Sequence, residues 1–180
     1  FKETLMTMYS HTGTHMDPPA HIFEGGRTLD AFDASDFTGS ALVIDCRHVG
    51  EGGRIPASAI EERLEDASSV DWLLFNTGWD RYWNTSAYFG DYPCLAPDAV
   101  ELIKRLHLKG LGFDTIGLDP IADEALTIHH ALLEGDRMLF VENLTKLDEL
   151  GYDKPVLLFA LPMKWASSDG APGRAIAICS

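Results

Sequence analysis

The sequence predicts a single α/β domain with a mixed central sheet, and three observations support this prediction. Short apolar runs alternate with helical patterns along the 180 residues. No internal repeat or linker-like stretch divides the chain, so we expect one domain over residues 1–180. The hydrophobic fraction of 46% and the charged fraction of 23% are typical of a globular chain that buries a continuous core.

Six apolar runs rich in β-branched and aromatic residues indicate buried strands. In chain order they are ALVIDC (41–46), WLLFNT (72–77), TIGLD (115–119), MLFVEN (138–143), PVLLFALPM (155–163) and AIAICS (175–180). Cys46 and Cys179 lie in two of these runs, so we expect both thiols to be buried.

Helical patterns lie between the runs, over residues 56–67, 97–110 and 127–136. The second begins with Pro97 and ends at Gly110, which are ordinary helix start and stop signals. Gly135 closes the third.

The charge balance excludes some classes of partner. The chain has 14 Lys and Arg against 28 Asp and Glu, a formal net charge of −14. Nucleic acids and anionic membranes attract basic surfaces, so we expect neither as a partner. The sequence has no apolar run of ~18 residues and no signal peptide at its start, and its three cysteines are widely spaced. These features predict a cytoplasmic protein.

One short segment, HTGTHMDPPAH, gathers side chains of the kind that bind metals. It contains His11, His15, Asp17 and His21. In a straight strand His11 and Asp17 would stand roughly 20 Å apart, too far to share an ion. Gly13 permits a turn that brings His11 and His15 together. Two imidazoles and a carboxylate suit Zn²⁺, Mn²⁺ or Fe²⁺, with positions left open for water. The alternative is a polar surface loop in which Asp17 caps a turn.

This segment resembles the HxGTHxDxPxH signature of the cyclase-like metal-dependent hydrolases, a family that includes bacterial kynurenine formamidases and isatin hydrolases. Every fixed position of the signature is present. The resemblance implies a swivelling β/β/α-type fold with a mixed central sheet. It also implies that His11, His15 and Asp17 bind metal and that His21 is the catalytic acid/base.

A second segment, HHALLEGDRMLFVEN, resembles the family's His-containing helix followed by a strand with a ligand glutamate. In the formamidase branch these two residues are twelve positions apart, as His130 and Glu142 are here. The resemblance therefore selects His130, rather than His129, as a metal ligand. From the residues alone, Glu142 in an apolar run is costly unless it is paired or metal-bound. The alternatives are an ion pair for Glu142 and a polar helix face for the two histidines.

The resemblance also implies the cofactor. With Asp17 and Glu142 as bridging carboxylates, the site would hold one or two divalent ions, Zn²⁺ or Mn²⁺. The formamidase branch uses zinc, whereas the isatin hydrolase branch uses one manganese and has glutamine where this chain has Glu142. Glu142 and His130 together favour the formamidase-like arrangement.

The segment TGWDRYW also recurs in the family beside the active site, which implies that Trp79, Tyr82 and Trp83 line a pocket for an aromatic substrate. A packed aromatic cluster is the alternative. Asp119 resembles a family position near the site, with no role assigned to it.

The resemblance implies a metal-dependent amidohydrolase that cleaves an aryl formamide, such as N-formyl-L-kynurenine, to kynurenine and formate in tryptophan catabolism. Two alternatives remain: an isatin hydrolase-like cyclic amide hydrolase, and a non-catalytic metal-binding assembly protein. Family members begin with a longer segment before the signature, so we expect the N-terminal segment here to be short or truncated. A missing first strand would leave a sheet edge unpaired, and we expect a homodimer or homotetramer.

Overall fold

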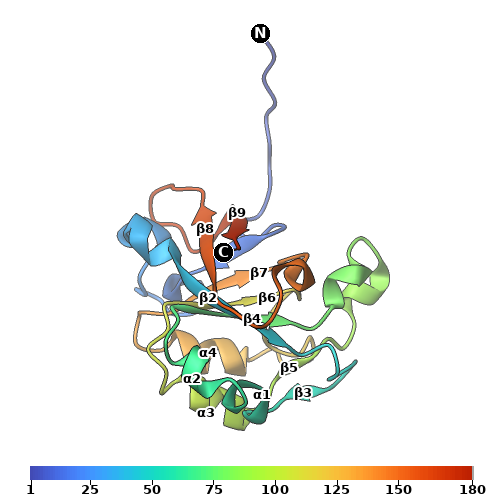
Figure 1. The fold of residues 1–180 in the computed structure, drawn as a ribbon. Helices are drawn as coiled ribbons and strands as arrows, with labels where there is room; N and C mark the ends of the chain where they lie inside the picture. Colours follow the sequence, from blue (N-terminus) through green and yellow to red (C-terminus); the bar gives the residue numbers. More distant parts are fainter. Residues whose placement is uncertain (180) are drawn as a thin grey trace.

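The computed structural model describes residues 1–179 as a barrel with helices on one side (Figure 1). Within these residues a closed barrel has the strand order β1-β7-β6-β4-β2-β8-β9. Its strands are β1 (His15–Asp17), β2 (Thr38–Asp45), β4 (Trp72–Asn76), β6 (Gly110–Phe113), β7 (Leu139–Glu142), β8 (Val156–Pro162) and β9 (Ala171–Ile178). Strands β2, β4, β6 and β7 run parallel, and the remaining pairings are antiparallel. The predicted single-domain α/β fold with a mixed sheet is confirmed.

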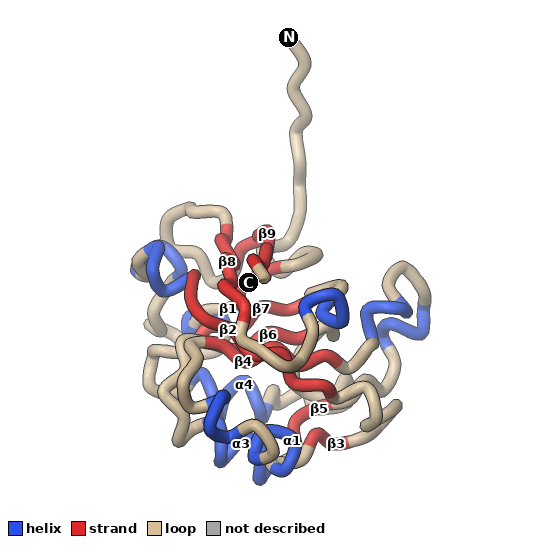
Figure 2. Tube along the Cα trace, viewed as in Figure 1, coloured by secondary structure: helices blue, strands red, loops and turns tan. Residues whose placement is uncertain are grey.

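The helices gather on the outer side of the parallel strands, beside a small parallel pair of strands (Figure 2). They are α1 (Ser58–Glu61), α2 (Leu64–Ala67), α3 (Pro97–Ile103) and α4 (Thr127–Leu133), and the pair is β3 (Arg54–Ile55) with β5 (Cys94–Leu95). Short 3₁₀ turns span Pro19–His21, Leu29–Ala31, Ala34–Phe37, Trp79–Tyr82, Ser86–Phe89 and Leu147–Leu150. All three predicted helical segments are helical, although 56–67 divides into α1 and α2, and α3 ends before 110.

Two hydrophobic cores lie on the two faces of the sheet. Successive side chains of a strand point to opposite faces, so Leu42 and Ile44 of β2 face the helices while Ala41 and Val43 fill the barrel. Trp72, which is fully buried, belongs to the barrel core. The sheet is therefore apolar on both faces, as a parallel sheet covered by helices requires.

Two of the predicted features are wrong. Residues 115–119 form a loop. The strand lies just before them as β6, and its two glycines, Gly110 and Gly112, gave no apolar pattern from which a strand could be predicted. Both glycines lie against neighbouring side chains, because an added Cβ would overlap Trp72 at Gly110 and Leu74 at Gly112. Cys46 is buried as predicted, but Cys179 is exposed because it follows the end of β9.

Strand β9 and the segment before β1 lie at one end of the barrel. Strand β9 pairs with β8 over residues 173–178, but it pairs with β1 only at Ala171 and Pro172. The segment Phe1–Tyr9 leaves the body beside β9 as an extended, exposed arm (Figure 1). Within residues 1–179, no helix has the length and apolar character needed to cross a membrane.

Candidate metal centre

The pairing of β1 with β7 brings ligand-type side chains from distant parts of the chain together. His15 lies directly opposite Glu142 in the antiparallel register, and Asp17 follows two residues later on the same face. Met16 and Val141, which alternate with them, belong to the barrel core. The sequence pattern therefore directs one imidazole and two carboxylates to the outer face, where all three are buried.

A turn at Gly13 adds a second imidazole. Gly13 has a φ of 67°, a left-handed conformation that favours glycine. After this turn His11 lies back against β1, with its Nδ1 2.6 Å from Asp17 Oδ1. Gly170 makes room for the ring, because a Cβ there would overlap it. The predicted approach of His11 to His15 and Asp17 is present, with the two ring centres 5.1 Å apart.

Asn143 holds this turn in place. Its Nδ2 donates to the Gly13 carbonyl at 2.9 Å, and its own carbonyl accepts from the Thr14 hydroxyl at 2.7 Å. The Oδ1 of Asn143 accepts from the buried Tyr88 hydroxyl at 2.7 Å. Sequence reasoning missed Asn143. The available signal was a side-chain amide directly after Glu142 in an otherwise apolar run.

The histidine that faces the cluster from α4 is His129, and the prediction of His130 is wrong. His129 is buried, and its Nε2 lies 3.3 Å from Glu142 Oε1 and 3.7 Å from Asp17 Oδ2. His130 is exposed and packs its ring edge-on against Phe23. Adjacent residues on a helix point about 100° apart, so both cannot face the same centre. Counting along a helix, a loop and a strand does not determine which one does.

Asp119 orients His129. One carboxylate oxygen accepts from His129 Nδ1 at 2.5 Å, and the two oxygens together accept the backbone N–H groups of Ile128 and His129 at the start of α4. Asp119 is itself buried. This bond leaves the Nε2 lone pair of His129 directed at the cluster, a common arrangement around histidine ligands.

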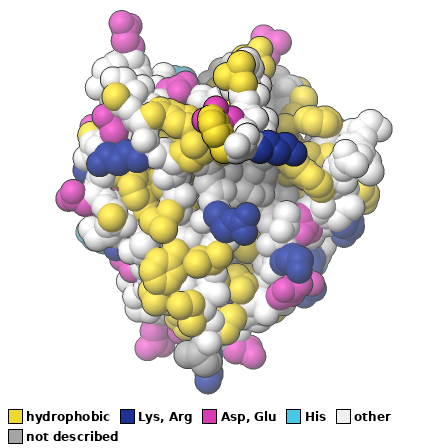
Figure 3. All heavy atoms as spheres, turned by 90° about the horizontal axis from the view of Figure 1, so that it is seen from above, with side chains coloured by type: hydrophobic (Ala, Val, Ile, Leu, Met, Phe, Trp, Pro, Cys, Tyr) yellow, Lys and Arg dark blue, Asp and Glu magenta, His cyan; other side chains and the backbone are white. Residues whose placement is uncertain are grey.

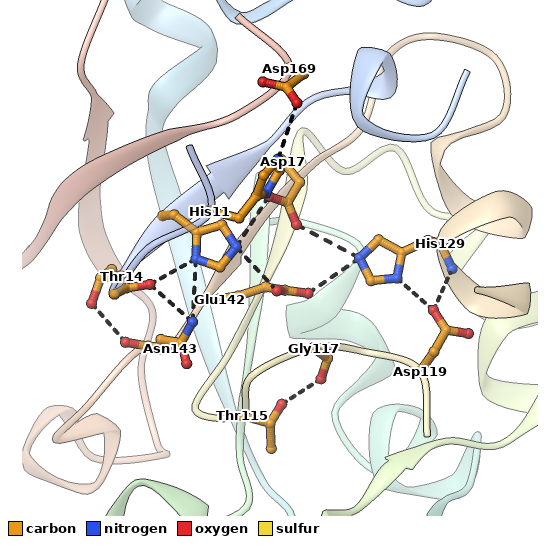
Figure 4. A network of polar contacts seen from close by, with 12 residues as sticks. His11, Thr14, Asp17, Thr115, Gly117, Asp119, His129, Glu142, Asn143 and Asp169 are labelled. Atoms are coloured by element: carbon orange, nitrogen blue, oxygen red, sulfur yellow. Dashed lines mark hydrogen bonds and ion pairs between the residues drawn. The ribbon is translucent and has the colours of Figure 1, made fainter. Parts of the chain in front are cut away.

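His15 is oriented in the same way by a backbone group. Its Nδ1 donates to the Gly13 carbonyl at 2.7 Å, and its Nε2 lies 3.4 Å from Asp17 Oδ1 and 3.3 Å from Glu142 Oε2. Each carboxylate thus turns one oxygen toward His15 and the other toward His129. Figure 4 shows Asp17 and Glu142 pointing at His129, with Asp119 on the far side of the ring.

The buried carboxylates change the pKa values of the two histidines beside them. Burial by itself lowers the pKa of His15, but the nearby carboxylates of Glu142 and Asp17 outweigh burial and raise the pKa to about 9. For His129, the hydrogen bond to Asp119 and the nearby carboxylates of Asp17 and Glu142 likewise outweigh burial and hold the pKa well above the ordinary value. The carboxylates therefore attract positive charge into the centre.

The buried polar atoms fit a divalent cation. Asp17 Oδ2, Glu142 Oε1 and His11 Nε2 are buried and have no hydrogen-bond partner among the described residues. His15, Asp17 and Glu142 each offer a ligand atom within 4.8 Å of the others, and so do His11, Asp17 and His21. Two groups that share Asp17 suit one or two ions with N and O ligands.

His21 lies at the end of the 3₁₀ turn Pro19–His21, next to this centre. Its ring centre is 4.0 Å from that of His11 and 5.8 Å from that of His129. Burial lowers the pKa of His21, and together with His11 and His129 it outweighs the opposite effect of Asp17 and Glu142. The neutral imidazole is therefore more favoured at His21 than in a free histidine.

A cavity of about 400 Å³ opens beside the centre, and the histidines and Glu142 lie in its wall. The rest of the wall includes Tyr92, Ile116, Gly117, Pro120, Ile121 and Leu126. Several of these residues come from the loop after β6, the segment that the sequence predicted as a strand.

The three predicted pocket aromatics do not line this cavity in the described part of the chain. Trp79 is buried, and its indole donates to the Tyr88 carbonyl at 3.0 Å. Tyr82 packs on Trp79, and Trp83 packs on Tyr88 while remaining half exposed. They form the packed aromatic cluster that was the alternative, and they reach the cavity only through Tyr92, which packs on Trp79.

Comparison with known proteins places this geometry in a family context. Residues 2–120 match the profile of the Cyclase family, which is more than half of the chain. The kynurenine formamidase of Erythrobacter litoralis (strain HTCC2594) is 32% identical over 171 residues, which are 95% of this chain and 74% of that protein. An isatin hydrolase bound to the product analogue thioisatinate has a TM-score of 0.85 at 27% identity, covering 98% of this chain and 75% of that one. A structure described as a potential metal-dependent hydrolase with cyclase activity has a TM-score of 0.80 at 27% identity, covering 95% and 80% of the two chains.

Proposed function

This chain belongs to the cyclase-like family of metal-dependent hydrolases, and we propose that it is an amidohydrolase that cleaves an aryl formamide such as N-formyl-L-kynurenine. The relative at 32% identity is a kynurenine formamidase. That reaction releases formate and an aromatic amine, here kynurenine, which belongs to tryptophan catabolism.

One observation carries the proposal: two fixed imidazole nitrogens and two buried carboxylates converge on one point. His15 and His129 each use Nδ1 for a hydrogen bond and direct Nε2 toward Asp17 and Glu142. Burying two carboxylates without hydrogen bonds to all their oxygens is costly, and a cation would offset this cost. The side chains that would hold one or two ions are His11, His15, Asp17, His129 and Glu142.

The metal and the protein groups would divide the chemistry. A divalent cation such as Zn²⁺ or Mn²⁺ would supply a Lewis acid to activate water and to offset the negative charge that develops on the amide oxygen. His21 accepts the proton of the attacking water and passes it to the amide nitrogen as the carbon–nitrogen bond breaks. Asp119 and the Gly13 carbonyl keep His129 and His15 in the required tautomers.

The cavity supports an aromatic amide as the substrate. Its volume of about 400 Å³ lies within the usual ~300–1,000 Å³ range of small-molecule sites. Tyr92, Ile121 and Leu126 offer an apolar wall for a ring, while the imidazoles of His11, His15 and His21 face the reacting end.

A cyclic amide is the second candidate substrate, because the isatin hydrolase structure superposes with a TM-score of 0.85. In that reaction an amide C–N bond of the ring is broken, and the amine and the new carboxylate stay in one ring-opened product. Glu142, in place of the glutamine expected in that branch, favours the formamide.

Turnover tests the proposal directly. The purified protein is freed of metal, loaded separately with Zn²⁺ and Mn²⁺, and supplied with N-formylkynurenine or isatin. We expect formate release from the first substrate, dependent on added metal. Hydrolysis of isatin alone would transfer the assignment to the cyclic amide. Stoichiometric metal without turnover of either substrate would favour a non-catalytic metal-binding assembly protein and contradict the proposal.

A further inference from the structure

The aromatic cluster around Trp79 packs behind the cavity wall and holds two buried tyrosines. Tyr88 and Tyr92 are 2% and 5% exposed. The Trp79 indole donates to the Tyr88 carbonyl at 3.0 Å, and its ring packs edge-on against Tyr92. Each tyrosine hydroxyl then bonds a group that holds a histidine of the metal centre.

The turn that carries Trp79 is fixed by a buried carboxylate. Asp114, directly after β6, accepts the backbone N–H groups of residues 77–79 and also the Thr77 hydroxyl. Gly78 has a φ of 68°, a left-handed conformation that glycine adopts without strain. These bonds tie the cluster to the sheet, so the two tyrosines extend from a fixed support.

Tyr88 determines which way the amide of Asn143 faces. Its hydroxyl donates to Asn143 Oδ1 at 2.7 Å, which leaves Nδ2 to donate to the Gly13 carbonyl at 2.9 Å. The same carbonyl accepts from His15 Nδ1 at 2.7 Å. Without the Tyr88 hydroxyl the amide could turn over and place its oxygen against the Gly13 carbonyl, where two acceptors repel each other. The Tyr88 hydroxyl therefore supports the bond that orients His15.

Tyr92 holds the other histidine through the backbone of Asp119. Its hydroxyl donates to the Asp119 carbonyl at 2.5 Å, in the loop after β6. The Asp119 carboxylate accepts from His129 Nδ1 at 2.5 Å. Gly117 leaves room for the hydroxyl, since an added Cβ would lie 3.1 Å from it. Because a loop lacks the hydrogen-bond ladder of a strand, the bond from Tyr92 fixes where the carboxylate lies.

The two routes meet the metal centre from opposite sides. In Figure 4, Asn143 and Asp119 lie on either side of Glu142. Burial raises the pKa of both tyrosine hydroxyls, so each one stays protonated and remains a donor. Figure 3 shows little histidine on the surface at the barrel end, so the ligands are held from inside the chain and not by contacts on that face.

We propose that Tyr88 and Tyr92 are positioning residues of the metal centre. Tyr88 fixes the direction of His15, and Tyr92 fixes the direction of His129. Because both hydroxyls extend from one fixed cluster, that cluster also sets how the two imidazoles lie relative to each other, and metal affinity depends on such supporting bonds. The segment TGWDRYW thus acts on the centre through Trp79, which packs behind the cavity wall. The inference rests on the metal site of the proposed function, and not on which amide is hydrolysed.

Binding of Co²⁺ to the metal-freed protein tests the proposal, because the visible absorption of Co²⁺ reports the geometry of its ligands. Tyr88→Phe and Tyr92→Phe each remove a single oxygen atom. We expect each to raise the dissociation constant for Co²⁺ roughly tenfold and to change the absorption spectrum. Tyr152→Phe is the matched control, since the Tyr152 hydroxyl accepts from the buried Asn76 amide at 2.7 Å, at the end of β4 and two strands from β7. It removes a bond of the same kind and should leave the constant and the spectrum unchanged.

A second set of variants identifies the route. Tyr88→Phe added to Asn143→Ala should cause no further loss of affinity, whereas Tyr92→Phe added to Asn143→Ala should cause its full loss. An unchanged constant and spectrum in either single tyrosine variant, an equal change in the Tyr152→Phe control, or additive losses from Tyr88→Phe and Asn143→Ala would each overturn the proposal. Wild-type protein that binds no Co²⁺ would overturn the proposed function as well, whereas bound Co²⁺ without amide turnover would count against the proposed function alone.

Discussion

In the proposed mechanism His21 moves a proton, and its removal separates this role from metal binding. We predict that His21→Ala lowers kcat by roughly 10²–10⁴ and leaves the metal content unchanged. Steady-state kinetics with the metal-loaded protein and metal analysis of the same sample provide the measurement. A parallel loss of bound metal would show that His21 is a ligand, as its proximity to His11 and Asp17 permits.

The adjacent pair His129 and His130 offers a matched comparison. We predict that His129→Ala loses bound metal, because its Nε2 faces Asp17 and Glu142. His130→Ala should keep both metal and turnover, because its ring is exposed and packs only on Phe23 among the described aromatic side chains. Metal analysis of both variants after dialysis shows which of the two histidines binds the metal. The reverse result would restore the assignment made from sequence spacing.

Asp119 acts on the centre through His129. We predict that Asp119→Asn weakens metal affinity by roughly 10–100-fold, because the ring loses the carboxylate that fixes its tautomer. Competition with a chelating dye measures the affinity. Asp123→Asn is the control: Asp123 accepts backbone N–H groups of Ala125 and Thr127 near the same helix start but does not bond His129. An equal loss of metal affinity in both variants would mean that Asp119 acts only by capping the helix.

Most of these residues were visible in the sequence, and the exceptions have a physical cause. His11, His15 and Asp17 lie in one short segment whose turn is set by Gly13, so local rules suffice. The choice of His129 depends on helix rotation, which spacing alone does not specify. Asn143 acts through hydrogen bonds to Gly13 and Thr14 at the other end of the chain, and such partners carry no periodic signal. Asp119 was placed near the site without a role, and its role follows from its bond to His129.

At the scale of elements, β6 shows how packing overrides propensity. A Cβ at Gly110 would overlap the Leu139 carbonyl and the Trp72 indole, neither of which can move freely. At Gly112 it would lie 2.6 Å from Leu74 Cδ2 and 2.7 Å from Leu144 Cδ1, which are ends of flexible side chains. The two glycines of one strand therefore differ in what a substitution costs.

We predict that Gly110→Ala destabilises the fold by about 1–3 kcal/mol or more and that Gly112→Ala costs less. Urea denaturation of both variants measures the difference. Equal free energies of unfolding would mean that the Trp72 side adapts as easily as the leucines do.

Many of the remaining elements could be predicted because their signals are local, whereas the short strands β1, β3 and β5 were not predicted. Apolar runs marked β2, β4, β7, β8 and β9 to within a few residues, and Pro97 marked the start of α3. Strand β6 was not predicted because glycine has no side chain whose apolar character would indicate a buried position. The loop after it was mistaken for a strand because Ile116 and Leu118 are apolar for a different reason: both pack against the outer core.

At the scale of the whole molecule, the centre links stability to pH. In metal-free protein the folded-state pKa of His15 is raised from 6.5 to about 9, and that of His129 is raised as well. Groups with raised pKa values stabilise the fold below their unfolded pKa, and this contribution is lost as the pH rises through the folded value.

We therefore predict that the Tm in EDTA falls by on the order of 5 °C between pH 6.5 and pH 9. Saturating Zn²⁺ or Mn²⁺ should raise the Tm most at the alkaline end, since ligands must lose their protons to bind metal. The His15→Gln variant in EDTA is the control and should show a smaller slope. A flat Tm for the wild type in EDTA across this range would contradict the electrostatic account.

Closure of the barrel is the feature that the sequence could not predict. The contact of β1 with β9 involves only Ala171 and Pro172, far too few positions to leave a pattern in the chain. Long-range features of this kind arise from how strands twist and meet, and not from the preferences of single residues.

Gly13 determines how His11 reaches the centre. Its left-handed backbone turns the chain so that the His11 ring lies against Asp17. Among the described residues nothing lies within 4 Å of an added Cβ at Gly13. The cost of a side chain there would therefore come from the backbone conformation and not from a clash, so the position of one imidazole depends on one backbone angle.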